Sequence, residues 1–293
     1  VLCFLIGCKR ARGFEVPSDI GQGLSRVDSL RALLGWLEGK RGYAADTLRL
    51  HVLYQLIEVI RSQNTDSAYA LAQRLESVVQ KSTYPPAKGL SELGWTLVYL
   101  NRAAYDSVFL RGRRALVLLE QSRHQKLQAR ALYLLGIGHH GQGIRDSARN
   151  YFERALSLSE AVGDKATQAD ACNRIGILHA EKGQYPQALE YFQKALTLRE
   201  AIGDESGMAY SYNNVGLIYK AQGKYAEALD YYRKSLDICQ AIGDRAGQAS
   251  PYNNIGLIYE AQGRYADALE YYQKALAIQE IIGDKQALAS LYT

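Results

Sequence analysis

The sequence predicts an all-α protein, an α-solenoid in which antiparallel helical hairpins stack on one another. Three observations predict this class: the chain repeats itself every 40 residues, each repeat carries two apolar stripes at helical spacing, and glycines separate the stripes. With 293 residues, of which 47% are hydrophobic, the chain is long enough to bury a large core.

The repeat is clearest in three consecutive segments that each begin with Gly-Asp and align without a gap. These segments are 163–202, 203–242 and 243–282. In the second of them, Val215 and Tyr219 share one helix face, and Ala228 and Tyr232 share another. Gly223, between the two stripes, fits a residue that ends a helix with a positive φ. Each segment is therefore predicted to be a helical hairpin, and such hairpins must stack because one alone cannot bury its apolar side.

Along the chain, we expect a truncated signal or anchor segment with a linker at 1–26 and degenerate helical repeats at 27–122. The degenerate part is expected to contain a cap at 27–42, an eroded helix pair at 44–82 and a more complete hairpin at 83–122. The regular array at 123–293 divides into 123–162, 163–202, 203–242, 243–282 and a partial unit at 283–293. Because the last unit stops inside its first helix, we expect more chain to follow Thr293 in the parent protein.

This pattern resembles the tetratricopeptide repeat, whose signature is a bulky residue, Leu-Gly and an aromatic, followed by Ala, an aromatic and Ala. The matching residues are Tyr212, Val215, Gly216, Tyr219, Ala228, Tyr232 and Ser235, and then Tyr252, Ile255, Gly256, Tyr259, Ala268, Tyr272 and Ala275. The 40-residue period is most similar to the subclass seen in Leu-Gly-Asn repeat proteins and kinesin light chains. The resemblance implies a superhelix of about six units plus a truncated seventh, whose first helices line a concave peptide-binding groove.

The stretch GIGHHGQG at 136–143 contains G-x-G-x-x-G, the pattern of a phosphate-binding loop. Such a loop needs a strand before it and a helix N-terminus after it. The 40-residue register instead places Gly136 at the helix-packing position and Gly143 at the turn. His139 then occupies an aromatic packing position, so we expect neither a nucleotide site nor a metal site here.

Two features depart from the repeat. Gly138 and Gly141 are additional glycines inside a predicted helix, and we expect them to weaken it and to make a soft joint. Pro251 lies inside another first helix, where its ring would clash with the carbonyl of Gly247. We expect a kink there, or a helix that begins late with Ser250 as its cap.

No catalytic arrangement is evident, since the sequence has no Ser-His-Asp pattern, nucleophile elbow, paired-carboxylate motif or P-loop. The four cysteines form no C-x-x-C pair, which argues against a zinc site and against a disulfide scaffold. Cys172 falls at a packing position and is expected to be a buried apolar residue. We therefore expect a binding protein rather than an enzyme, with no cofactor and no metal.

The groove positions implied by the resemblance lie one turn before and one turn after the packing glycine. The candidates are Asn173, Arg174, Asn213, Asn214, Asn253 and Asn254, and then Lys220 and Glu260. Because asparagine both donates and accepts hydrogen bonds, these side chains could clamp the backbone of a peptide. The alternative is that they form a ladder of hydrogen bonds between repeats. The predicted function is a protein-interaction scaffold whose partner is a peptide or a helical segment of another protein.

An alternative function is the N-terminal sensory or regulatory segment of a bacterial signalling protein, such as a histidine kinase or a transcription regulator. Nucleic acid is a further option, because residues 1–162 carry 22 Lys and Arg against 14 Asp and Glu, whereas 163–293 carry 13 against 16. No interleaving of aromatic and basic residues accompanies this excess, so it favours solvated helix faces over nucleic-acid binding.

The N-terminal run VLCFLIGCKR is too short to cross a bilayer. Leu5-Ile6-Gly7-Cys8 resembles a bacterial lipobox, in which the cysteine becomes lipidated. This resemblance implies that Cys8 anchors the chain to a membrane on the periplasmic side. The alternatives are an ordinary helix fragment and a cytoplasmic location.

Overall fold

The computed structural model describes residues 26–61 and 64–282, and these residues form thirteen helices and no strand. The predicted anchor Cys8 and the partial unit at 283–293 lie outside the described residues. The chain separates into two compact units, of which unit 1 ends at Gly163 and unit 2 begins at Asp164. No described helix is both long and apolar enough to cross a membrane.

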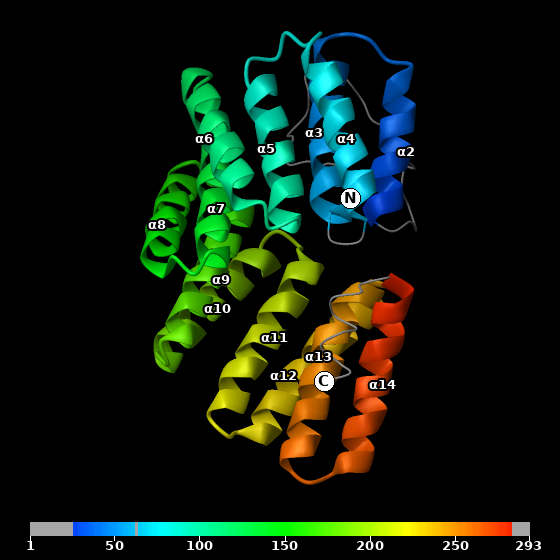
Figure 1. Cartoon of the computed structure of the whole chain (residues 1–293), viewed down its shortest axis with the longest axis vertical. Coiled ribbons are helices and arrows are strands. Elements are labelled where there is room, and N and C mark those ends of the chain that lie inside the picture. The colour runs from blue at the N-terminus through cyan, green and yellow to red at the C-terminus, as the bar shows by residue number, and fades with distance from the viewer. Residues whose placement is uncertain (1–25, 62–63, 283–293) are drawn as a thin grey trace. The chain divides into compact units, whose positions relative to one another are not determined.

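Unit 1 contains seven described helices, shown from blue to green in Figure 1. They are α2 (Arg26–Glu38), α3 (Tyr43–Ile60), α4 (Thr65–Val79), α5 (Ala87–Asn101), α6 (Tyr105–Gln121), α7 (Gln125–Gly141) and α8 (Arg145–Ala161). The helices pair as α3 with α4, α5 with α6 and α7 with α8, while α2, at the position expected for a cap, packs against α3. The second helix of one pair also packs against the first helix of the next, as α4 does on α5 and α6 does on α7.

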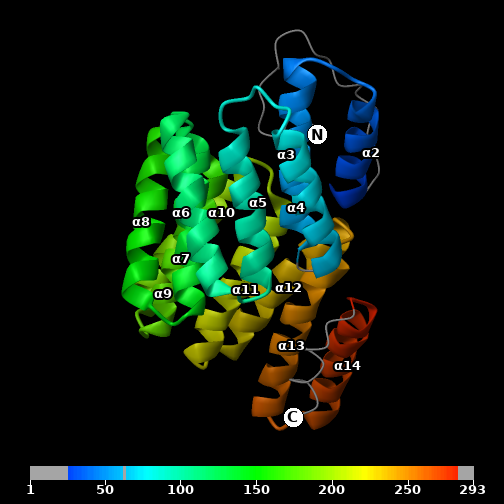
Figure 2. The same ribbon diagram turned by 45° about the horizontal axis from the view of Figure 1, so that its top comes forward.

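Unit 2 contains three hairpins built in the same way (Figures 1 and 2). Its helices are α9 (Lys165–Glu181), α10 (Tyr185–Glu200), α11 (Glu205–Ala221), α12 (Tyr225–Ala241), α13 (Arg245–Ala261) and α14 (Tyr265–Ile282). We call the first helix of each pair the A helix and the second the B helix. Neighbouring A helices contact each other, α9 with α11 and α11 with α13. Each B helix packs against the A helix of the following hairpin. The predicted all-α solenoid fold of stacked hairpins is confirmed.

A glycine facing an aromatic ring lets the two helices of a hairpin approach closely. A Cβ atom added to Gly216 would lie 2.6 Å from the Tyr232 ring, and one added to Gly176 would lie 2.7 Å from the Phe192 ring. Both distances are far below van der Waals contact, so only a residue without a side chain fits at these positions. The rings of Phe192 and Tyr232 are almost completely buried beneath these glycines.

The stretch 136–143 forms the C-terminal part of helix α7 and the turn that follows it. Gly143 has a φ of +76°, as the prediction of a turn glycine requires. His139 stacks between Phe109 and Tyr151, at ring-centroid distances of 4.5 and 5.1 Å, which confirms its packing role. The nucleotide-loop interpretation is therefore excluded by the helical conformation.

The additional glycines of α7 have a packing reason. A Cβ on Gly138 would lie 2.9 Å from Val108, and one on Gly141 would lie 2.5 Å from the Tyr105 hydroxyl. Both contacts come from α6, so these glycines admit side chains of the preceding B helix. The soft joint expected at this helix stays a prediction.

Helix α13 begins at Arg245, and the side chain of its N-cap, Asp244, accepts a hydrogen bond from the backbone N–H of Gly247. The predicted late start with Ser250 as cap is therefore wrong. The Asp cap outweighs the local effect of Pro251, which lies inside the continuous helix. The alternative of a kink stays a prediction.

Unit 1 contains a half-buried row of titratable side chains that joins three segments. The Tyr84 hydroxyl lies 3.3 Å from Nε2 of His51 on α3 and 3.1 Å from Nε2 of His124, the N-cap of α7. Burial, with smaller contributions from positive charge on His124 and Lys126, lowers the pKa of His51 to about 4. A proton therefore binds His51 in the unfolded chain at a higher pH than in the folded one.

This shift predicts that unit 1 loses stability as the pH falls from about 6.5 to about 4, since the unfolded chain binds the proton first. Replacing His51 by Phe keeps the ring contact with Tyr84 and removes the titration. Between pH 7 and 4.5, the unchanged chain should lose about 2 kcal/mol more unfolding free energy than His51→Phe, as measured by urea denaturation. The same loss in both chains would contradict the role of His51.

The Tyr232 hydroxyl is buried and has no hydrogen-bond partner among the described residues, whereas the equivalent Tyr272 hydroxyl donates to Glu260. Tyr232→Phe removes the desolvation cost of that hydroxyl, and phenylalanine already fills the equivalent position at 152 and 192. We expect the unfolding free energy to rise by about 1 kcal/mol in a denaturant titration. The control Tyr272→Phe should bring no gain, and a destabilised Tyr232→Phe would show that the hydroxyl has a partner.

Candidate functional site

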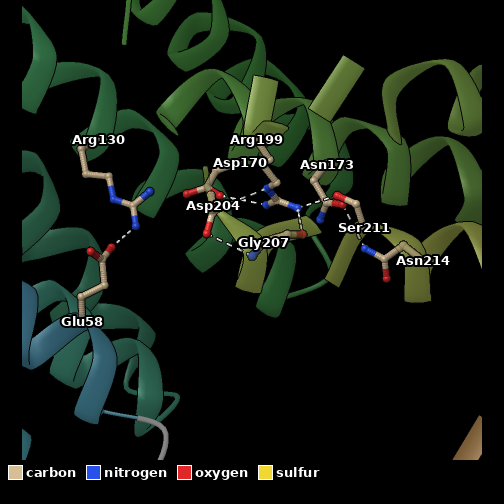
Figure 3. A network of polar contacts seen from close by, with 9 residues as sticks. All are labelled: Glu58, Arg130, Asp170, Asn173, Arg199, Asp204, Gly207, Ser211 and Asn214. Carbon is tan, nitrogen blue, oxygen red and sulfur yellow. Dashed lines mark hydrogen bonds and ion pairs between the residues drawn. The ribbon is translucent and has the colours of Figure 1, made fainter. Parts of the chain in front are cut away.

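The predicted asparagines lie between neighbouring A helices of unit 2. Asn214 on α11 donates a hydrogen bond from Nδ2 to Oδ1 of Asn173 on α9, at 3.0 Å (Figure 3). Asn254 on α13 donates in the same way to Asn213 on α11, also at 3.0 Å. All four side chains are buried. The geometry favours the interpretation that these asparagines link repeats, which the sequence analysis had left open beside peptide binding.

The other four candidates lie around this ladder. Arg174, Asn253 and Lys220 are half-buried, and burial lowers the pKa of Lys220 below its ordinary value. Glu260 is exposed and accepts a hydrogen bond from the Tyr272 hydroxyl, so its partner belongs to its own hairpin. Within the described chain, no ion pair joins Lys220 to Glu260.

The directions in which Asn213 and Asn214 point show which face of helix α11 is turned away from the neighbouring A helices. Successive residues of a helix turn by about 100°, so Tyr210 and Leu217 point between Asn213 and Asn214. Since Asn213 reaches α13 and Asn214 reaches α9, the bisecting direction leads away from both neighbours. Tyr210 is 46% exposed there.

Equivalent positions on α9, α11 and α13 carry an aliphatic row, Ile177, Leu217 and Leu257. Ile177 and Leu217 are half-buried, and Leu257 is 37% exposed. We call these three residues and Tyr210 the A-face row. The sequence analysis missed it because apolar residues at helical spacing are equally typical of a core. The sequence offers one signal for the row: its three aliphatic residues lie seven positions after residues 170, 210 and 250. Seven positions are about two helical turns, so each aliphatic residue shares a helix face with the earlier residue.

A buried arginine links the first two hairpins of unit 2. Arg199 on α10 is 4% exposed, and its Nη1 donates to the carbonyl of Gly207 at 2.7 Å and to the hydroxyl of Ser211 at 2.5 Å. Its Nη2 donates to Asp170 on α9 at 3.1 Å. Asp204, the N-cap of α11, lies 3.6 Å from its Nε and accepts from the backbone N–H of Gly207 (Figure 3).

The sequence carried one signal for this network that was not used. The positions 40 residues before and after Arg199 are Ser159 and Cys239, so a long cation replaces a small residue in a buried stripe. Such a replacement needs buried acceptors, and the nearby Asp170 and Asp204 supply two carboxylates. The network is structural, because every group that it contains belongs to helices α9 to α11.

A second polar link lies in unit 1, where Arg130 on α7 forms an ion pair with Glu58 on α3 (Figure 3). The guanidinium of Arg130 also lies 4.7 Å from the centre of the Tyr133 ring. The described residues contain no group of three or more side chains that could hold a metal ion. Cys172 is buried, as predicted.

Arg199→Met should destabilise unit 2 by about 1–3 kcal/mol, because the Ser211 hydroxyl and the Gly207 carbonyl would lose a buried donor. The matched control is Arg233→Met, which removes an exposed ion pair with Asp230 from the equivalent helix α12. The control should change the unfolding free energy by less than about 0.5 kcal/mol. Urea denaturation of both variants measures the difference, and equal effects would argue against the network.

Comparisons with known proteins bear on this fold. The model of a family described as Tetratricopeptide repeat matches residues 127–201 and 207–281, which together make up just over half of the chain. No curated protein sequence matches the chain. The two matched segments contain the four hairpins from α7 to α14.

Three solved structures illustrate the likeness. BtubC (BKLC) from P. vanneervenii is 21% identical, and the alignment covers 79% of this chain and 92% of that one, with a TM-score of 0.57. The quorum sensor NprR from B. thuringiensis was also solved in complex with its cognate peptide NprX. In that complex NprR is 17% identical, and the alignment covers 90% of this chain and 74% of NprR, with a TM-score of 0.63.

A Rap protein complexed with Competence and Sporulation Factor is 15% identical over 88% of this chain and 70% of its own, with a TM-score of 0.66. At such identities these structures speak for the fold alone. The family model is the stronger finding, because it covers more than half of the sequence and its matches coincide with observed hairpins. The chain belongs to the tetratricopeptide repeat family.

Proposed function

We propose that the chain is a protein-interaction scaffold that binds a peptide or a helical segment of a partner protein on the A helices of unit 2. The observation that carries this proposal is the A-face row. Tyr210 and Leu257 leave 46% and 37% of their surface exposed on a face that no other described helix of unit 2 covers. Ile177 and Leu217 pack partly against the core, so Tyr210 and Leu257 are the exposed members of the row, and exposed apolar side chains of this kind are typical of a binding surface.

The chemistry of the face suits a mainly apolar ligand with polar edges. Each ligand side chain buried against Leu217 or Leu257 contributes about 1.5–3 kcal/mol before the cost of ordering the ligand. Lys220 and Asn253, half-buried at the edges, can donate hydrogen bonds to ligand carbonyls or to an acidic group. Two or three such contacts correspond to micromolar-scale affinity.

Similar structures support the proposal. NprR is the protein solved in complex with its cognate peptide, and the Rap protein was solved with Competence and Sporulation Factor. In this chain the four paired asparagines form hydrogen bonds with one another across repeats. The A-face row, and not the asparagine ladder, is therefore the main contact surface for the peptide in this proposal. Binding without catalysis is the activity that this surface can perform.

The sensory or regulatory alternative stays a prediction from the sequence, as does the lipid anchor at Cys8 with its periplasmic location. No described residue bears on either of them.

The experiment selects peptides from a displayed random library on the immobilised chain and measures a selected synthetic peptide by fluorescence anisotropy. Tyr210→Ala combined with Leu257→Ser should weaken binding at least about tenfold, because two apolar contacts are lost. The matched control is Leu269→Ser, which changes an exposed leucine of the B helix α14. It should leave the affinity within about twofold.

Unchanged affinity in a folded Tyr210→Ala/Leu257→Ser variant would place the peptide elsewhere and refute the proposal. An equal loss in the control would mean that the substitutions act through stability. Far-UV circular dichroism of each variant separates the two cases.

A further inference from the structure

Unit 2 has a cleft on the side of its B helices. A cleft of about 370 Å³ lies between α10 and α12, with α11 as its floor. Its lining includes Leu189 and Gln193 of α10, Tyr212 and Tyr219 of α11, and Tyr231 and Lys234 of α12. The asparagine ladder and the A-face row lie on other faces of α11, so this cleft is separate from the proposed peptide face.

The tyrosine ring faces in this cleft are already occupied. Tyr219 and Tyr231 stack with their centroids 5.3 Å apart and their planes 9° apart. Lys234 Nζ lies 4.8 Å from the centre of the Tyr231 ring, and Lys224 Nζ lies 5.8 Å from that of Tyr219. A ligand in the cleft therefore meets ring edges and hydroxyl groups rather than open ring faces.

The polar groups of the cleft lack partners within the protein. Among the described residues, no hydrogen bond reaches the hydroxyls of Tyr212, Tyr219 and Tyr231, and no carboxylate pairs with Lys234. The next hairpin has the same arrangement, but there Tyr252 accepts from Gln240 and Lys274 pairs with Glu270. The cleft between α10 and α12 thus presents several unused hydrogen-bond donors beside apolar walls.

These properties select among ligands. A sugar needs an open aromatic face, and a cationic ligand would compete with the lysines that cover the rings. An acidic segment would meet Glu200, which also lines the cleft and offsets the charge of Lys234. An uncharged ligand that is rich in carbonyl acceptors and carries compact apolar rings satisfies all these constraints.

A polyproline II segment has these features. Its backbone makes no internal hydrogen bonds, so its carbonyls are available to tyrosine, lysine and glutamine donors. Its pyrrolidine rings fit against leucine side chains and tyrosine edges, and because the helix is preformed, little conformational entropy is lost on binding. We propose that the cleft between α10 and α12 binds a proline-rich segment of a partner protein in the polyproline II conformation.

The test titrates the whole chain into a fluorescein-labelled oligoproline peptide of about twelve residues and follows its anisotropy. Saturable binding with a Kd below about 1 mM is expected. Tyr219→Phe combined with Tyr231→Phe keeps both rings and removes two donors, so the affinity should fall at least about fivefold. The matched control, Tyr259→Phe with Tyr271→Phe, makes the same change in the next hairpin and should leave the affinity within about twofold.

Several outcomes would overturn the proposal. They are absence of binding up to about 1 mM, unchanged affinity in the Tyr219/Tyr231 variant, an equal loss in both tyrosine variants, and stronger binding of a glutamate-rich peptide of the same length. The Tyr210→Ala/Leu257→Ser variant should bind oligoproline as the unchanged chain does. The two binding proposals can therefore fail independently.

Discussion

In the four hairpins from α7 to α14, a glycine of the A helix lies in close contact with an aromatic ring of the B helix, and this contact is the constraint on which the regular part of the structure depends. At Gly216, a single added carbon atom would lie 2.6 Å from the Tyr232 ring. This contact brings the two helices together, and it buries the Tyr232 ring completely. Because the four hairpins from α7 to α14 all close in this way, the faces that remain for stacking and for binding recur at the same positions in each of these repeats.

Stacking of the hairpins in unit 2 then uses polar links, of which one recurs between repeats and another occurs at a single junction. Asn173 and Asn214 join α9 to α11, and Arg199 joins α9, α10 and α11 through contacts with four groups. A buried guanidinium needs acceptors, and Arg199 finds them for Nη1 and Nη2, while its Nε has only the ion pair with Asp204; these contacts fix the register of α11 against the preceding hairpin. The Arg199 link is specific to one junction, whereas the asparagine bond recurs between α11 and α13 and the glycine–ring contact recurs in the four hairpins from α7 to α14.

The function follows from what these links leave unused. The asparagine side chains turn toward neighbouring A helices, and of the two residues between them Tyr210 is exposed and Leu217 is half-buried. On the B-helix side, the hydroxyls of the stacked pair Tyr219 and Tyr231 lie in a cleft and have no hydrogen-bond partner among the described residues. One unit therefore presents two faces of different chemistry, one mainly aliphatic and one rich in hydrogen-bond donors.

The sequence by itself determined the helical hairpins, their 40-residue period and the packing role of residues such as Gly136 and His139. These features are local or repeat at fixed spacing, so periodicity and glycine positions suffice to predict them. Local reasoning did not determine the start of α13, where the Asp244 cap prevailed over Pro251. Only the tertiary structure decided that the asparagines pair across repeats and that Arg199 is buried among three helices. Such contacts join residues of different hairpins, and their geometry depends on how neighbouring helices pack, which no single repeat encodes.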